Sequence, residues 1–152
     1  MQLAVISRGG KMRLEFTIKC IPPKSTHQAA LRILKRPDGT QFVGKFATSK
    51  GKHAQNELMM LFTPHRPAVS FKGPLRLKII WMYPYRKAEP KSRRQPYKPC
   101  DTRPDVDNLA KFIMDIMTRL GFYGDDGQVS ELRFIKCWNK ETGIAVTLEE
   151  LT

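Results

Sequence analysis

Apolar and polar residues alternate along several stretches of the chain, which is the pattern of β-strands with one buried face. The first stretch is residues 13–20, and Pro22-Pro23 ends it. The second starts at Leu75 and runs into the aromatic residues 81–83. Residues 144–148 follow the same pattern, and residues 129–138, after the turn at Gly124-Asp-Asp-Gly127, are a further expected strand, so the sequence predicts at least four strands.

Turn and helix signals indicate two further elements. Residues 31–46 contain Pro37-Asp38-Gly39, a turn-forming combination, and predict a hairpin around it. Residues 53–62 predict a short helix, because Pro64 and Pro67, which follow it, end a helix.

The stretch that follows residue 105 has a helical period instead. Its apolar positions fall at i, i+3, i+4, i+7, i+8 and i+11 and form one continuous face: Leu109, Phe112, Ile113, Ile116, Met117 and Leu120. Glycine is common just after the last residue of a helix, so Gly121 predicts the end of this one. Strands and a principal helix predict an α+β protein, and 152 residues with 41% hydrophobic content suit a single domain spanning residues 1–152.

Several classes of protein are disfavoured. No apolar run approaches the roughly 20 residues that cross a bilayer, and the first ten residues lack the pattern of a signal peptide. Cys20, Cys100 and Cys137 are isolated and have none of the spacings of zinc sites. We therefore expect a soluble protein of a reducing cytoplasm, with no membrane partner and with residues 1–12 as a flexible N-terminal extension.

The charge is unevenly distributed. The net charge is +13; residues 1–104 contain 22 basic and 5 acidic residues, whereas residues 105–152 contain 5 basic and 9 acidic residues. A basic surface attracts polyanions through counterion release, and nucleic acid is the commonest such partner. A merely solvated basic surface, a membrane-surface contact or a ribosomal contact are the alternatives.

Residues 86–104 predict a basic loop. This stretch is rich in proline and has little to bury, so regular structure is not expected. It leads directly into a cluster of acidic residues, which suggests that its cations bind DNA phosphates. The candidates are Arg86, Lys87, Lys91, Arg93, Arg94, Lys98 and Arg103.

Five of the fourteen acidic residues lie between Asp105 and Asp126. Asp105 and Asp107 precede the helix, and side chains two apart in an extended segment project to the same side. If the helix begins at about Asp107 or Asn108, Lys111 lies one turn later and can reach the same space. Asp126 would have to be brought there by the fold, since the helix is about 20 Å long at roughly 1.5 Å per residue.

Three carboxylates around one point repel one another unless a cation lies among them. Mg²⁺ prefers oxygen ligands and could polarise a phosphoryl oxygen, as phosphodiester hydrolysis requires. A structural interpretation stays open, because Asp107 is an ordinary N-cap candidate and Asp-Asp-Gly is a common turn. An EF-hand is excluded, because Leu109 and Ile116 occupy positions where a Ca²⁺ loop needs oxygen ligands.

The element Asp105-Val-Asp-Asn-Leu-Ala-Lys111, followed after the apolar helix by Gly121-Phe-Tyr-Gly-Asp-Asp-Gly-Gln-Val129, resembles the core motif of the RusA family of Holliday junction resolvases. Order and spacing agree from Asp105 to about Lys136. The resemblance implies a small mixed sheet with one principal helix packed on it, and a homodimer. The family's metal-binding aspartates fall on Asp105, Asp107 and Asp126 and its functional lysine on Lys111; Asn108 and Asp125 also match the pattern.

This resemblance implies an activity as well. It is the Mg²⁺-dependent endonucleolytic resolution of four-way DNA junctions in recombination and repair, with Mn²⁺ able to substitute, by a cytoplasmic enzyme that a phage or prophage encodes. Two other interpretations stay open. One is a nuclease with a broader preference for flaps and forks, and the other is a non-catalytic nucleic-acid-binding protein whose aspartates only cap a helix and shape a turn.

Overall fold

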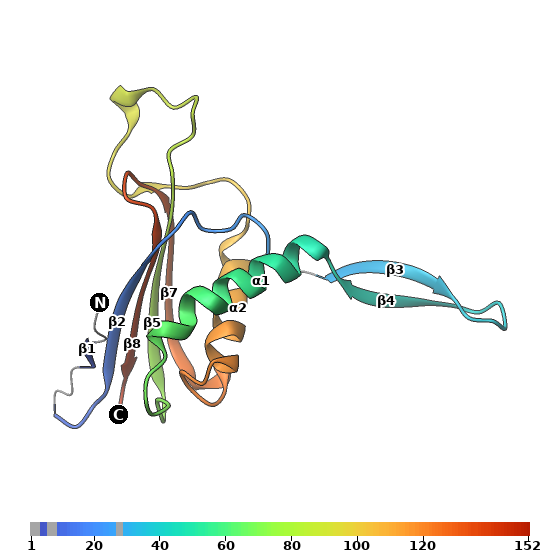
Figure 1. The fold of residues 1–152 in the computed structure, drawn as a ribbon, viewed down its shortest axis with the longest axis horizontal. Helices are drawn as coiled ribbons and strands as arrows, with labels where there is room; N and C mark the ends of the chain where they lie inside the picture. Colours follow the sequence, from blue (N-terminus) through green and yellow to red (C-terminus); the bar gives the residue numbers. More distant parts are fainter. Residues whose placement is uncertain (1–3, 6–8, 27–28) are drawn as a thin grey trace.

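The computed structural model describes residues 4–5, 9–26 and 29–152. A six-stranded mixed sheet has the order β1-β2-β8-β5-β7-β6 (Figure 1). Its strands are β1 Ala4–Val5, β2 Arg13–Lys19, β5 Leu75–Tyr83, β6 Lys98–Pro99, β7 Val129–Trp138 and β8 Gly143–Glu150. Only β5 and β7 are parallel neighbours. A parallel pair needs a long connection, and here that connection contains the basic loop and the helix with the acidic motif.

Two helices of fourteen residues cover one face of the sheet, α1 Ser49–Phe62 and α2 Val106–Arg119 (Figure 1). Three short 3₁₀ turns complete the body: η1 Thr63–His65, η2 Lys91–Arg93 and η3 Asp126–Gln128. The expected α+β fold is confirmed. The expectation of one principal helix was incomplete, because α1 begins at Ser49 rather than at residue 53 and equals α2 in length.

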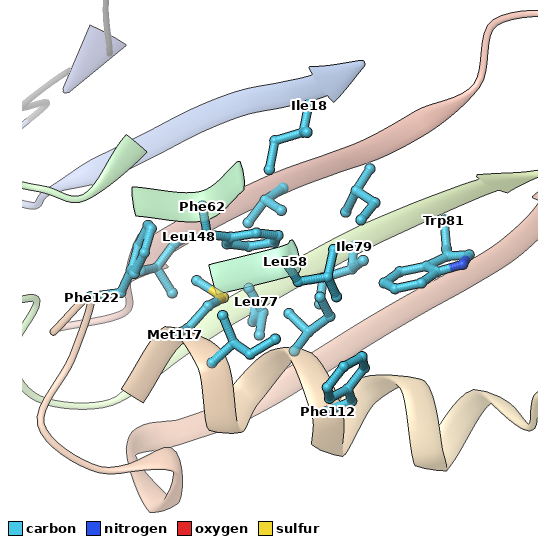
Figure 2. Packing of buried hydrophobic residues seen from close by; sticks show 14 of the residues in the cluster. Ile18, Leu58, Phe62, Leu77, Ile79, Trp81, Phe112, Met117, Phe122 and Leu148 are labelled. Atoms are coloured by element: carbon cyan, nitrogen blue, oxygen red, sulfur yellow. The ribbon is translucent and has the colours of Figure 1, made fainter. Parts of the chain in front are cut away.

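The core lies between the sheet and the two helices (Figure 2). Alternate residues of β2 point into it, so Leu14, Phe16 and Ile18 are buried while their neighbours are exposed. The predicted apolar face of α2 is buried as well, except that Leu120 is only partly covered at the helix end. Each fully buried Leu or Ile contributes roughly 1.5–3 kcal/mol relative to exposure, so this face fixes α2 firmly on the sheet.

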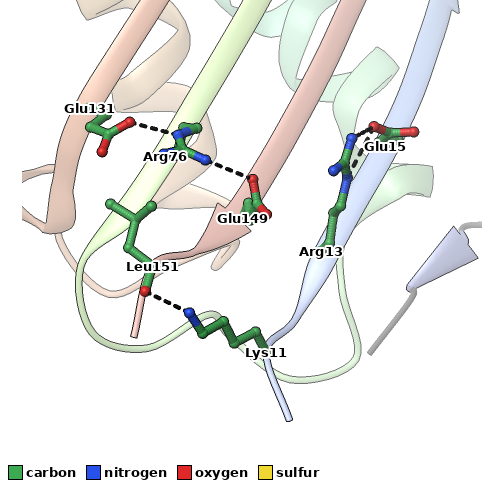
Figure 3. A network of polar contacts seen from close by, with 7 residues as sticks. All are labelled: Lys11, Arg13, Glu15, Arg76, Glu131, Glu149 and Leu151. Carbon is green, nitrogen blue, oxygen red and sulfur yellow. Dashed lines mark hydrogen bonds and ion pairs between the residues drawn. The ribbon is translucent and has the colours of Figure 1, made fainter. Parts of the chain in front are cut away.

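The opposite face of the sheet carries ion pairs (Figure 3). Arg76 on β5 contacts Glu131 on β7 at 2.6 Å and Glu149 on β8 at 3.4 Å, so one guanidinium joins three adjacent strands. Arg13 pairs with Glu15 on β2. Glu131 and Glu149, two acidic residues of the C-terminal third, therefore have a structural role.

The predicted hairpin is confirmed and lies apart from the body (Figure 1). Strands β3 Ala29–Lys35 and β4 Gln41–Ala47 pair only with each other, in an antiparallel two-stranded sheet. Gly39, with a φ of 85°, permits the turn between them. We call residues 29–47 the arm.

Other expectations have mixed outcomes. The strands predicted at residues 13–20, 75–83, 129–138 and 144–148 are all present within a few residues. Of the expected N-terminal extension, Ala4–Val5 pairs with β2, whereas residues 1–3 and 6–8 lie outside the described residues. The three cysteines are free thiols. In the described part of the chain, no helix has the length and apolar character needed to span a membrane.

Candidate active site

Helix α2 begins one or two residues earlier than the sequence indicated. Its N-cap is Asp105, in an extended conformation with φ −73° and ψ 147°, and its carbonyl oxygen accepts the first helical hydrogen bond from the Leu109 N–H at 3.1 Å. Asp107 is already in the first helical turn. The expectation that both aspartates precede the helix in an extended segment was therefore wrong for Asp107, and the alternative in which Asp107 is the N-cap does not hold either.

The start of α2 leaves two carboxylates exposed. The Asp105 side chain makes no capping hydrogen bond, although residues of this type usually do so at this position. Asp107 is exposed in the first turn, and Lys111 is exposed four residues further on, so both lie on one side of the helix. The carboxylate of Asp107 also suits the positive end of the helix dipole.

Lys136 holds the segment that leads into Asp105. From β7, its ammonium donates hydrogen bonds to the carbonyl oxygen of Pro104, at 2.7 Å, and to that of Thr102. Lys136 is half-buried, and hydrogen bonds from a charged donor are about twice as strong as neutral ones. The backbone before Asp105 is thereby tied to β7.

A cleft of about 530 Å³ opens beside Asp105. Asp105 and Asn108, from the start of α2, line one part of it, and Lys50, from the start of α1, lines another. Lys24 and Arg103 add two more exposed cations. Two helix N-termini, each with a positive dipole end, and three cations thus surround one space, which suits a phosphate group.

Local contacts place the cationic side chains of this cleft. The Tyr83 hydroxyl at the end of β5 donates to the Pro23 carbonyl oxygen at 2.9 Å and thereby holds the segment before Lys24. Burial raises the pKa of Tyr83 to about 12. The Thr48 hydroxyl accepts from the Gly51 N–H at 3.1 Å and caps α1, which fixes Lys50 at its start.

Sequence reasoning missed Lys24 and Lys50. Both lie in a long basic region with many similar lysines, and nothing in the local pattern shows that they come close to residue 105. The available signal was Thr48-Ser49, a natural N-cap pair ahead of the predicted helix. Extending that helix to its cap would have placed Lys50 at its positive end.

The basic loop is more ordered than expected, because it contains η2 and β6. Glu89 organises it by forming ion pairs with Lys98 and, at 3.7 Å, with Arg86. The hydrogen bond from Lys98 holds the pKa of Glu89 below its usual value. Arg86 also lies over the Trp138 ring at 4.6 Å, and Arg94 over the Tyr85 ring at 5.5 Å.

The seven predicted DNA-binding cations are therefore of two kinds. Arg86, Arg94 and Lys98 take part in contacts that order the loop itself. The other members are exposed on the surface of the loop or, in one case, in the cleft: Lys87, Lys91, Arg93 and Arg103. The DNA-binding role of all seven stays a prediction.

The second acidic element forms a tight turn. The Asp125 carboxylate accepts from the Gly127 N–H at 2.7 Å, and the Gln128 side-chain oxygen accepts from the N–H groups of Gly124 and Asp125 at 2.9 and 3.1 Å. Gln128 also donates to the carbonyl oxygens of Phe71 and Gly73 at 3.3 and 3.1 Å. Asp125 and Gln128 therefore build the turn, and Asp126 is presented on its exposed side.

Asp126 does not reach Asp105 within one chain. The two residues lie beyond opposite ends of α2, a helix of fourteen residues and about 20 Å. Within residues 4–5, 9–26 and 29–152, no three His, Cys, Asp or Glu side chains are grouped so that they could hold a metal ion. The role of Asp105, Asp107, Lys111 and Asp126 in catalysis stays a prediction.

Residues 20–149 match the family Endodeoxyribonuclease RusA. The chain belongs to the RusA family. The matched range contains both acidic elements, the cleft and the arm, so the activity class of the chain is that of a DNA endonuclease.

Two relatives extend this comparison. The chain is 33% identical to the crossover junction endodeoxyribonuclease rusA of Lactococcus phage r1t, over 93% of this chain and 99% of that protein. It is 28% identical to the uncharacterized protein YqaN of Bacillus subtilis (strain 168), over 77% of this chain and 88% of that protein. Both alignments cover most of either chain, so the resemblance extends well beyond the short acidic motif.

Proposed function

We propose that this RusA-family protein is a metal-dependent endonuclease that resolves four-way DNA junctions in recombination and repair. The observation that carries the proposal is the cleft beside Asp105, where two helix N-termini and three cations surround a space next to an exposed carboxylate. Such a cleft attracts a phosphate, and the carboxylate supplies a metal ligand next to it.

The residues present fit a divalent metal. Asp105 is exposed and makes no capping hydrogen bond, and Asp107 is exposed in the following turn. Mg²⁺ is usually held through one or two carboxylates together with substrate phosphates and waters. When bound, such an ion would polarise a phosphoryl oxygen and lower the pKa of a bound water. We propose Mg²⁺, with Mn²⁺ able to substitute.

The cations have separate tasks in this proposal. Lys24, Lys50 and Arg103 bind the DNA backbone in the cleft and orient the phosphate to be cut. Lys111 neutralises the negative charge that develops on that phosphate during hydrolysis, because its ammonium lies one turn from Asp107. Asn108 lines the cleft and can donate a hydrogen bond to a phosphate oxygen.

We further propose a homodimer in which Asp126 serves the site of the partner. A two-fold axis that makes two α2 helices antiparallel brings the η3 end of one copy to the Asp105 end of the other. Each site then has Asp105 and Asp107 from one copy and Asp126 from the second. Two such sites related by symmetry suit a junction, whose paired strands must both be cut.

One assay tests the proposed function. Purified protein is incubated with a labelled four-way junction, a flap and a linear duplex of equal length, in Mg²⁺ or in EDTA. We expect paired, symmetric cuts in the junction that require Mg²⁺, with little cutting of the linear duplex. Equal cutting of flap and junction would support the broader branched-DNA nuclease instead, and binding without any cutting would support a non-catalytic DNA-binding protein.

A further inference from the structure

The arm exposes apolar side chains on both of its faces. Five of the eleven exposed large hydrophobic residues of the described chain lie on it. On one face Leu31, Ile33 and Val43 are 64%, 71% and 64% exposed, and on the other Phe42 and Phe46 are 39% and 42% exposed. The assignment to faces follows from the register, in which Ile33 is directly opposite Val43.

The arm has a closed tip although it covers no core. The tip is closed by hydrogen bonds between the backbones of Arg36 and Thr40, at 2.8 Å, and Asp38 accepts from the Thr40 N–H at 2.9 Å. A bulky residue at position 44 would collide with Phe46, since an added Cβ would lie 2.8 Å from its ring. An isolated two-stranded hairpin is marginally stable in water, so a ligand that covers the apolar faces would stabilise it.

Charge identifies the chemistry of that ligand. Lys35 and Lys45 share the face of Ile33, and Arg32 and Arg36 share the face of Phe42. Asp38 is the one acidic residue of the arm, and its carboxylate accepts two hydrogen bonds from Thr40. Each face thus combines apolar side chains with flanking cations, which matches unstacked bases between phosphates.

A second copy of the chain is a poorer occupant. It carries the same net charge of +13 and the same basic arm. It would also cover only one face of a flat, two-sided hairpin, whereas an opening between base pairs encloses both faces. A two-stranded ribbon is thin enough to enter a DNA groove, and apolar side chains inserted between base steps unstack them.

We propose that the arm inserts into the branch point of the junction and holds it open, with Ile33 and Val43 against the exposed bases. This rests on the proposed function, because it names the part of the chain that distinguishes a branch from a linear duplex. The cleft beside Asp105 would then bind the backbone on the same DNA, since the arm leads directly into the Thr48 cap of α1.

The test compares two double variants with matched exposure. Ile33→Thr/Val43→Thr removes apolar groups from the arm and keeps residues that favour strands. Ile21→Thr/Val69→Thr makes the same change on the body, at side chains that are 68% and 61% exposed. Affinity for a four-way junction and for a linear duplex is measured without metal, together with the fluorescence of 2-aminopurine placed at the branch point.

We expect the arm variant to lose about tenfold in junction affinity, with duplex affinity little changed, as loss of base stacking would produce. The rise in 2-aminopurine fluorescence given by the wild type should also be lost, and the body variant should behave as the wild type. Unchanged junction binding and fluorescence in the arm variant would overturn the proposal.

Two further measurements separate other outcomes. The exchange Ile33→Val/Val43→Ile keeps the apolar surface and should bind junctions normally; failure of this variant would assign the loss to hairpin packing and overturn the proposal. A fall in mass by light scattering for the threonine variant would show that the arm binds a second copy instead. Cutting by the wild type in Mg²⁺ is scored separately, so failure of the nuclease assignment is distinguishable from failure of the arm assignment.

Discussion

Asp105 and Asp126 flank the same helix and lie beyond its opposite ends, with the fourteen residues of α2 between them. Both side chains are exposed. A metal site that needs both residues must therefore take them from two chains, and the two sites of a dimer must then share their parts reciprocally.

Mixing two inactive variants tests this arrangement. Asp105→Asn and Asp126→Asn should each be inactive alone, because every site has lost one carboxylate. In a mixed dimer, one site combines both substitutions and the other has none. After random exchange about half of the dimers are mixed, so activity should return to about a quarter of the wild-type level. Because each mixed dimer has one intact site, the product should be a nick in one strand. Cutting of labelled junctions after the variants are refolded together provides the measurement.

The same experiment has an internal control. Asp105→Asn mixed with Asp107→Asn should stay inactive, because both residues belong to the same half of a site and no site in the mixed dimer is intact. Recovery in this second mixture, or none in the first, would contradict a site shared between copies. Light scattering should report about twice 17.5 kDa for each protein used.

Removing a carboxylate should affect cutting far more than folding. Asp105→Asn costs no capping hydrogen bond, and Asn is about as good an N-cap as Asp, so the free energy of unfolding should change by less than about 0.5 kcal/mol. Asp107→Asn loses a helix-dipole interaction of about 0.3–1 kcal/mol. Cutting in Mg²⁺ should nearly vanish in both, while junction binding in EDTA stays equal or becomes tighter because a negative charge is gone.

A neighbouring aspartate provides the matched control for the second element. Asp125→Asn still accepts the hydrogen bond from Gly127 through its amide oxygen and should cut at the wild-type rate. Asp126→Asn, one residue later, should not cut. If the Asp105→Asn, Asp107→Asn and Asp126→Asn proteins cut normally, or if denaturant unfolding shows that they fail to cut only because they have lost their fold, the aspartates of the motif only cap a helix and shape a turn.

The acidic motif shows how far the sequence could be interpreted. Its periodic apolar face fixed α2 within a few residues, because burial of that face dominates the local energetics. The turn itself was predicted from Asp-Asp-Gly, but the motif could not show that Gln128 anchors this turn to Phe71 and Gly73, since those partners are identified only by the fold. Nor could it show the distance between Asp105 and Asp126, which depends on where the chain turns after α2.

For the basic residues, the sequence predicted the class of partner but not the role of each side chain. Counting charges indicated a polyanionic partner correctly for a family of DNA endonucleases. It could not separate cations that order a loop from cations that we propose to bind DNA, because Lys98 and Arg94 look the same in sequence as Lys91 and Arg93. The distinction comes from Glu89 and Tyr85, whose side chains engage the first two.

This distinction predicts different salt dependences. Lys24→Gln/Lys50→Gln should reduce the log–log slope of junction affinity against salt by about two units if each lysine contacts one phosphate. Arg93→Gln should reduce it by about one unit. Arg94→Gln should leave the slope nearly unchanged and instead loosen the loop, because the Arg94 guanidinium lies over Tyr85 and donates to the Glu89 carbonyl oxygen at 3.3 Å.

Fluorescence anisotropy titrations between low and moderate salt would measure these slopes. Lys72→Gln serves as the control, since it removes one exposed cation beside Gly73 that is not among the residues lining the cleft. Equal slopes for the lysine pair and for the wild type would show that Lys24 and Lys50 are only solvated.

Lys136 offers a test of positioning rather than of direct chemistry. Lys136→Met keeps the length of the apolar stem but removes the donor to the carbonyl oxygens of Thr102 and Pro104, which leaves the segment before Asp105 untied. A displacement of about 1 Å at a catalytic group can reduce a rate by about 100-fold. We expect single-turnover cutting to fall by about ten- to 100-fold while junction affinity in EDTA changes by less than about threefold, since no phosphate contact is lost.

Because a loosely held Asp105 binds metal less well, the half-saturating Mg²⁺ concentration should rise, and excess Mg²⁺ should restore part of the rate. Lys140→Met, at an exposed position just beyond β7, should match the wild type in all three measurements. A Lys136→Met protein that cuts slowly with an unchanged Mg²⁺ midpoint would show that Lys136 acts on some other part of the site.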